Sequence, residues 1–128
     1  MKVGDSWEHQ WAMTEKVWDN FISLSDDRNP MHTDSKFAKS HGFREKVMHG
    51  NILNAFLSFF VGELLPVKNV VILGQSIKYA QPIYMNDRVT LKVELSEYIE
   101  AVSMFDFSFV FEVGGQKVAS GKLQIKSL

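Results

Sequence analysis

Residues 21–65, FISLSDDRNPMHTDSKFAKSHGFREKVMHGNILNAFLSFFVGELL, are the stretch on which the interpretation of the whole chain depends. The stretch starts with a polar loop that contains Asp27 and His32, and a proline between them stiffens this loop. After Gly50 the sequence becomes apolar nearly all round, which predicts a helix over residues 52–65 that is buried on most sides. A carboxylate and an imidazole therefore precede the positive end of a buried helix, and such groups suit acid–base chemistry beside a developing negative charge.

The apolar helix carries one narrow polar stripe. At about 100° per residue, Asn51, Asn54, Ser58 and Gly62 project to the same side. We expect a polar partner, or a closely approaching backbone, to meet this side of the helix.

The segments outside this stretch predict further helices and a set of antiparallel strands. Residues 7–13 alternate as a strand would, a helix follows the cap residue Thr14 and ends near residues 25–27, and a short helix is expected at about residues 34–39. The period then changes to two, and strands are predicted at residues 70–79, 89–95, 105–113 and 118–125, with a hairpin turn at Gly114-Gly115. This order favours an α+β fold in which a curved antiparallel sheet wraps around the apolar helix.

Length and composition limit the class of protein. With 128 residues, the chain is expected to form one domain, residues 1–128. Its net charge of −1 argues against a nucleic-acid partner, and the absence of cysteine excludes disulfides, thiol nucleophiles and thiolate metal sites. The first residues do not resemble a signal peptide, and the longest apolar run is shorter than the roughly 20 residues needed to cross a bilayer. We therefore expect a cytoplasmic protein with no membrane partner.

Asp27 and His32 are the first candidates for a catalytic pair. Around a tight turn, two side chains separated by this stiff loop can converge on one point. Their pairing would suit activation of a single water, because a carboxylate can orient an imidazole and histidine titrates near neutral pH. Asp, Asn and Pro are also common turn formers, so the motif taken alone favours a capped turn and a surface histidine.

Gly50 and Ser58 are candidates on or beside the helix. The Gly50 N–H would lie at the positive end of the helix dipole, where it could hold an oxygen that gains negative charge. A glycine that only permits a sharp turn into the helix is an equally good interpretation. Ser58 could reach the reaction site or orient Asp27, or its hydroxyl could bond back to its own helix.

The sequence suggests no catalytic role for the remaining histidines. They are interpreted as structural in the case of His49 and incidental in the case of His9 and His41. The spacing of the histidines and carboxylates does not predict a metal site.

Several motifs together resemble the signature of the (R)-specific enoyl-CoA hydratases, also called MaoC-like dehydratases. These motifs are SDDRNPMH at residues 25–32, FA at 37–38, HG at 49–50, LGQS at 73–76, QPI at 81–83 and NDRV at 86–89. The resemblance covers most of the chain. It implies a hot-dog fold, in which an antiparallel sheet wraps around a long central helix and usually continues into that of a second subunit.

The resemblance also implies roles for individual residues. The catalytic pair falls on Asp27 and His32, the backbone oxyanion donor on Gly50, a supporting asparagine on Asn29, and a serine near the site on Ser58. In two places the chain departs from the family pattern.

These departures lie beside the site residues. Asp26 occupies a position often held by glycine, and Asn51 follows His-Gly where a bulky apolar residue is more usual. Neither change removes a reacting group, but Asn51 could alter the polarity of the pocket.

The activity implied by the resemblance is the reversible hydration of a trans-2-enoyl thioester, within fatty acid metabolism. The substrate would be a thioester of coenzyme A or of acyl carrier protein, with no metal or redox cofactor, and the enzyme would be a homodimer or a larger homo-oligomer built of dimers. Two alternatives are a hot-dog acyl thioesterase and a non-catalytic acyl-binding or regulatory subunit.

Overall fold

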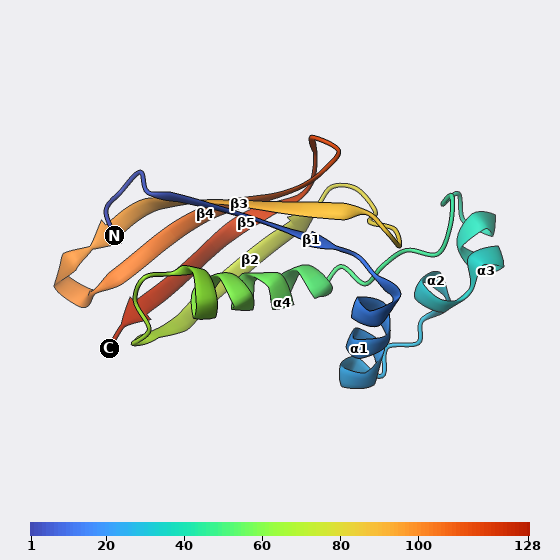
Figure 1. The fold of residues 1–128 in the computed structure, drawn as a ribbon, viewed down its shortest axis with the longest axis horizontal. Coiled ribbons are helices and arrows are strands. Elements are labelled where there is room, and N and C mark those ends of the chain that lie inside the picture. The colour runs from blue at the N-terminus through green and yellow to red at the C-terminus, as the bar shows by residue number, and fades with distance from the viewer.

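One antiparallel sheet forms the larger layer of the computed structural model, which describes residues 1–128 (Figure 1). Its five strands lie in the order β1-β3-β4-β5-β2. The strands are β1 (Ser6–Ala12), β2 (Val70–Tyr79), β3 (Arg88–Ile99), β4 (Met104–Val113) and β5 (Gln116–Ser127). Strands β1 and β2 are therefore the two edges of the sheet.

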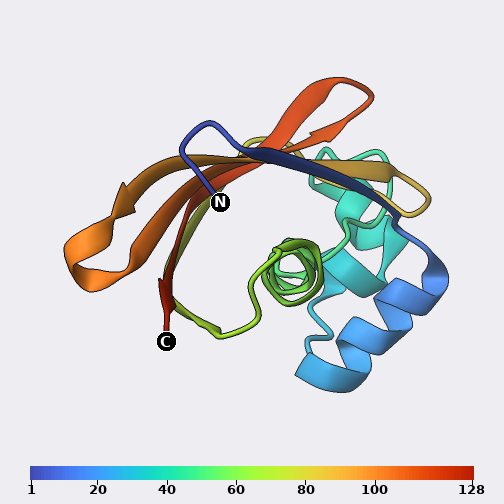
Figure 2. The same cartoon turned by 60° about the vertical axis from the view of Figure 1, so that its left-hand side comes forward.

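The central helix lies along the concave side of this sheet. Helix α4 (Ile52–Phe59) continues into one π-helical turn, Phe60–Leu64, and Figure 2 looks along its axis with the sheet curving around it. The other helical segments are α1 (Glu15–Ser25), α2 (Pro30–Thr33), α3 (Ser35–Ser40) and a 3₁₀ turn at Glu100–Val102. Helices α1 to α3 gather beyond the N-terminal end of α4 (Figure 1).

The expected hot-dog architecture is confirmed, with two corrections. The α-helical part of the central helix is only eight residues long, because the hydrogen bonds widen to a π turn from Phe60 onward. The segment after Asn29 was expected to be a turn, but Pro30 instead begins helix α2. A proline is well suited to the first helical position, because its φ is already helical and its missing N–H has no partner to lose there.

Alternating apolar side chains from the strands pack against α4 to form the core. Leu91, Val93 and Leu95 of β3 lie directly opposite Phe111, Phe109 and Phe107 of β4, and all six are buried. On the helix, Ile52, Leu53, Phe56 and Leu57 are buried. Burial of each such side chain is worth roughly 1.5–3 kcal/mol, so this contact fixes α4, and with it residue 50, against the sheet.

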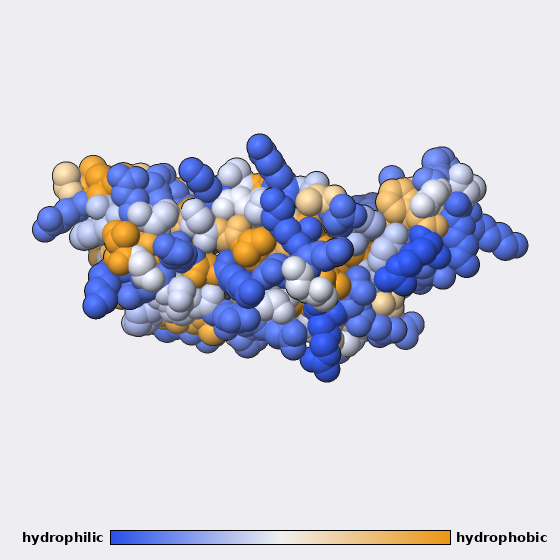
Figure 3. All heavy atoms as spheres, turned by 90° about the horizontal axis from the view of Figure 1, so that it is seen from above, coloured by the Kyte–Doolittle hydropathy of each residue, from blue (hydrophilic) through white to orange (hydrophobic).

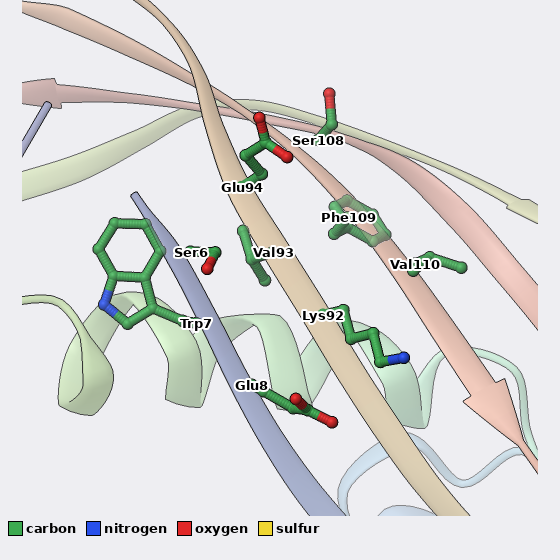
Figure 4. A pocket seen from close by; sticks show the side chains of 9 residues that line it. All are labelled: Ser6, Trp7, Glu8, Lys92, Val93, Glu94, Ser108, Phe109 and Val110. Carbon is green, nitrogen blue, oxygen red and sulfur yellow. The ribbon is translucent and has the colours of Figure 1, made fainter. Parts of the chain in front are cut away.

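The outer face of the sheet is mainly polar, as Figure 3 shows. A groove of about 480 Å³ crosses β1, β3 and β4, and among its lining residues Glu8, Lys92 and Glu94 are charged (Figure 4). The Lys92 ammonium is 2.7 Å from Glu112, and this contact raises the pKa of Lys92. The groove holds charges of both signs and contains no histidine, so the candidate catalytic groups lie elsewhere.

None of the helices has both the length and the apolar character that a membrane crossing requires.

Gly121 of β5 lies between β2 and β4, paired with Ile77 and Phe109, and its replacement tests this packing. A Cβ at residue 121 would overlap the Ser76 carbonyl oxygen of β2 and lie 2.8 Å from Phe109 Cζ. Because the strand backbone cannot move aside, Gly121→Ala is expected to lower the free energy of unfolding by about 3 kcal/mol, measured by urea denaturation. Gly62→Ala is the control: a Cβ there has no neighbour within 4 Å, so its stability should equal that of the wild type or exceed it by up to about 1 kcal/mol. Equal stability of the two variants would contradict the close contact of residue 121 with β2 and β4.

Candidate active site

The end of helix α1 directs Asp27 into the site. Asp26 caps the helix in a left-handed conformation, with φ at 55°, and its N–H donates to the Ile22 carbonyl. Glycine is the commonest residue at such a cap because it has no Cβ to strain. This geometry explains why Asp26 stands where glycine is often found: aspartate tolerates the same conformation better than most residues.

Asn29 connects Asp27 to helix α2. Its backbone N–H donates to Asp27 Oδ1 at 3.1 Å, and its side-chain oxygen accepts from the Met31 N–H at 2.9 Å, which caps α2. His32 lies in this helix. A single asparagine therefore holds both the Asp27 carboxylate and the helix that carries His32.

The hydrogen bond of His32 to the main chain assigns the protons of its ring. His32 Nδ1 is 2.8 Å from the Val47 carbonyl oxygen. A carbonyl can only accept, so Nδ1 carries the hydrogen and the neutral ring has a free lone pair on Nε2. Nε2 lies 3.8 Å from Asp27 Oδ2. This separation is too long for a direct hydrogen bond, and it suits a water that contacts both atoms.

His49 also belongs to this cluster, although its sequence position gave only a structural interpretation. Its ring is 2% exposed, and its Nε2 donates to the Asp27 carbonyl oxygen at 2.9 Å. The ring stacks on His32 with 4.0 Å between centroids. Burial lowers the pKa of His49, so the ring is neutral near pH 7. Nothing in the sequence except proximity to Gly50 could have indicated these contacts.

A cavity of about 440 Å³ joins His32 to the start of α4. Its lining includes His32, Phe43, Gly50, Asn51, Tyr79 and Pro82. The Gly50 N–H has no acceptor within the chain. A Cβ on residue 50 would lie 2.8 Å from Tyr79 Cε1, so only glycine fits under the tyrosine ring as it stands. The cavity is thus lined both by His32 and by a glycine whose N–H has no acceptor within the chain.

Asn51 and Asn54 of the polar stripe have a polar partner in strand β2, whereas Ser58 and Gly62 are exposed. The Asn54 amide donates to Asn51 Oδ1 at 2.9 Å, Gln75 of β2 donates to Asn54, and the Tyr79 hydroxyl donates to Asn51 Oδ1 at 3.3 Å. Burial raises the pKa of Tyr79. Asn51 and Tyr79 line the cavity, so this network makes one wall polar.

Ser58 does not join the other candidates within one chain. Its side chain is exposed, makes no hydrogen bond within the chain and is absent from the lining of the cavity. No hydrogen bond between Ser58 and Asp27 therefore supports the suggested role of Ser58 in orienting Asp27.

Asp27, His32 and His49 are also the residues that could hold a metal ion. One ligand atom from each lies within 4.8 Å of the other two. His32 Nδ1 and His49 Nε2 face main-chain carbonyl oxygens, so the free lone pairs lie on His32 Nε2 and on His49 Nδ1, which is buried without a partner. A carbonyl on the other ring nitrogen is common for metal-ligating histidines, so the same three groups can form an acid–base cluster or a set of metal ligands.

The fold and this cluster are those of a known family. Residues 3–107 match the family model of the MaoC-like domain, and the chain belongs to this family. Among related sequences, the (R)-specific enoyl-CoA hydratase of Aeromonas caviae is 33% identical over 107 residues, which is 83% of this chain and 80% of that protein. A 3-hydroxybutyryl-CoA dehydratase of Methylorubrum extorquens is 28% identical over 83% of this chain and 68% of its own length.

Solved structures agree with this assignment. The (R)-hydratase from A. caviae superposes with a TM-score of 0.92 at 28% identity, covering 100% of this chain and 98% of that one. An R-hydratase from Pseudomonas aeruginosa gives a TM-score of 0.90 at 25% identity, covering 99% and 82%. The family suggested by the motifs is confirmed.

Removal of the Asn29 cap tests whether this residue holds His32. Asn29→Ala should lower the free energy of unfolding by about 1 kcal/mol, and it should shift the imidazole resonances of His32 in ¹⁵N NMR spectra. Thr14→Ala is the control, because Thr14 caps α1 by accepting from the Val17 N–H at 3.2 Å. It should cost similar stability and leave the His32 resonances in place. Unchanged His32 resonances in Asn29→Ala would contradict the supporting role.

Proposed function

We propose that this protein catalyses the reversible hydration of a trans-2-enoyl thioester to the (R)-3-hydroxyacyl thioester. The observation that carries the proposal is the pair formed by Asp27 Oδ2 and His32 Nε2, 3.8 Å apart. Gly50, whose N–H has no acceptor within the chain, lines the same cavity as His32. Membership of the MaoC-like family, with relatives named as hydratases and dehydratases, supports the same reaction.

In the proposed reaction, one water lies between Asp27 and His32. His32 Nε2 takes a proton from this water while the water oxygen forms a bond to C3 of the substrate. Asp27 Oδ2 accepts the other hydrogen of the water and orients it, and the aspartate remains a carboxylate. His32 then gives its proton to C2, so that one water is added across the double bond and both side chains return to their starting states.

Gly50 is proposed as the donor to the thioester oxygen. As C3 is attacked, electrons of the double bond move toward the carbonyl, and negative charge develops on its oxygen. A backbone N–H at the start of α4 can stabilise this charge without reorganisation, and the helix dipole adds to the effect. We propose coenzyme A as the acyl carrier, because the relatives at 28–33% identity are named for CoA substrates.

Crotonyl-CoA distinguishes this function from thioester hydrolysis. Hydration should remove the ultraviolet absorbance of the conjugated enoyl group without releasing free thiol. Release of thiol at the same rate would instead indicate a thioesterase. Binding of crotonyl-CoA without either change would indicate a non-catalytic acyl-binding subunit.

Asp27→Asn tests the role of the carboxylate in this assay. Because Asp27 Oδ1 accepts the Asn29 N–H, the substituted amide should keep its oxygen there and turn its NH₂ group toward His32. The water then loses an acceptor, and kcat should fall by about 10²–10⁴-fold. Asp26→Asn is the control, since the Asp26 carboxylate is exposed and lies 3.9 Å from Arg28. It should retain wild-type kcat, and full activity in Asp27→Asn would overturn the assignment.

We also propose that a second copy of the chain covers strand β2. Strand β2 is an edge of the sheet, and its Val71, Ile72 and Leu73 are 41–50% exposed. An apolar edge strand with free backbone groups is commonly covered in natural proteins. Pairing of two β2 strands about a twofold axis would give a homodimer with one continuous sheet.

Light scattering during gel filtration tests this assembly. The wild type should elute at about twice the 14.7 kDa of one chain. Leu73→Lys should shift the protein toward the monomer, because two like charges would then face each other near the axis. Leu24→Lys changes an 82% exposed leucine on α1 and should leave the dimer intact. A wild-type protein that stays monomeric at about 100 µM would contradict the proposal, because that concentration is well above a micromolar dissociation constant for the dimer.

A further inference from the structure

His49 is the one buried polar side chain of the protein, and both faces of its ring are covered. The ring centroid lies 4.0 Å from that of His32 and 4.8 Å from that of Phe21. Its Nε2 is 2.9 Å from the Asp27 carbonyl oxygen. His49 thus contacts both members of the acid–base pair, while the cavity lining does not include it.

The hydrogen bonds give the two stacked imidazoles opposite tautomers. His32 carries its hydrogen on Nδ1, because that atom faces the Val47 carbonyl oxygen. His49 carries its hydrogen on Nε2, because that atom faces the Asp27 carbonyl oxygen. The lone pair of His49 Nδ1 is left buried and without a donor.

Stability alone does not explain a histidine at residue 49. A buried acceptor without a partner lowers the stability of the fold. A phenylalanine between Phe21 and His32 would fill similar space and stack in the same way, without that unpaired lone pair. Phenylalanine, however, cannot supply the N–H that holds the Asp27 carbonyl.

We propose that His49 is a positioning residue, whose N–H fixes the main chain of Asp27 and whose ring fixes the plane of His32. Together these contacts keep Asp27 Oδ2 and His32 Nε2 on either side of one water. Burial lowers the pKa of His49, the Asp27 carbonyl opposes this shift, and the neighbouring His32 reinforces it. The titratable groups that face His49 are Asp27 and His32 alone. The catalytic part of this inference rests on the proposed hydratase function.

Three variants separate positioning from packing. His49→Phe keeps the stacked ring and loses the N–H, so kcat for crotonyl-CoA should fall about 10–100-fold with KM within threefold. Its Tm should equal or exceed that of the wild type. His49→Gln keeps a donor near Asp27 and should retain kcat within about fivefold. Phe21→Leu keeps the hydrogen bond and loosens packing, so Tm should fall while kcat stays within about twofold.

Each outcome of this series is decisive. Wild-type kcat in His49→Phe would overturn the proposal, as would losses of kcat that follow Tm across all three variants. Should His49→Phe fail to fold, a 100-fold loss of kcat in a stable His49→Gln would overturn it as well.

Two measurements test the same inference without any activity. In ¹⁵N NMR spectra near pH 7, His32 should be protonated on Nδ1 and His49 on Nε2, and the reverse assignment for His49 would refute the contact. A crystal structure of His49→Phe should show Asp27 Oδ2 displaced from its 3.8 Å distance to His32 Nε2. An unchanged distance would overturn positioning even if the wild type proves to have another activity, so failure of the two proposals can be told apart.

Discussion

The bond between His32 Nδ1 and the Val47 carbonyl is the interaction on which the site depends. Its 2.8 Å length makes it a good hydrogen bond, although such a bond adds only about 1 kcal/mol to stability. Its larger effect is on the position of a proton, because it leaves the lone pair of the neutral ring on the side that faces Asp27. Val47 in turn donates its N–H to the Met31 carbonyl at 2.9 Å. Helix α2 and the segment before α4 are therefore joined by two bonds that run in opposite directions.

The packed core determines where this segment can lie. Helix α4 is buried against the sheet, and Met48 just before it donates its N–H to the Ile83 carbonyl at 2.8 Å. Gly50 follows within two residues, so its N–H has little freedom. The reacting loop is thus held by a rigid scaffold, as is common for functional loops. Asp27 and Asn29 then need only local hydrogen bonds to complete the arrangement.

Sequence reasoning predicted most of the fold because the signals are local and strong. The alternation of residues 105–113 and the Gly114-Gly115 turn define the β4–β5 hairpin, and residues 52–65 define the central helix. Local patterns could not show the change to π-helical hydrogen bonds after Phe59, because it depends on tertiary packing. Helix α2 begins with a local signal, the Asn29 cap followed by Pro30, but the same residues are also typical of a turn.

The same limit applies to the site. The motif identified Asp27, His32 and Gly50 as candidates, and the structure brings Asp27 and His32 close together with Gly50 in the adjoining cavity. The contact of His49 with Asp27 could not be predicted, because it spans 22 residues of sequence and involves a main-chain carbonyl. Every residue has a main-chain carbonyl, so the sequence does not indicate which one a histidine will bond. The position of Tyr79 over Gly50 was equally hidden, because it depends on how β2 crosses the helix.

The π turn at Phe60–Leu64 has a consequence for how the central helix ends. A wider turn leaves main-chain oxygens at its end without helical partners, and the helix dipole makes that end negative. Lys68 supplies the missing donor, with Nζ 2.9 Å from the Gly62 oxygen and 3.2 Å from the Glu63 oxygen. The ammonium group of a residue that follows the helix thus caps the last carbonyls of the helix, and this residue lies just before the start of β2. In this protein the C-terminal end of the central helix is capped by a lysine side chain from the loop before β2 rather than by a glycine.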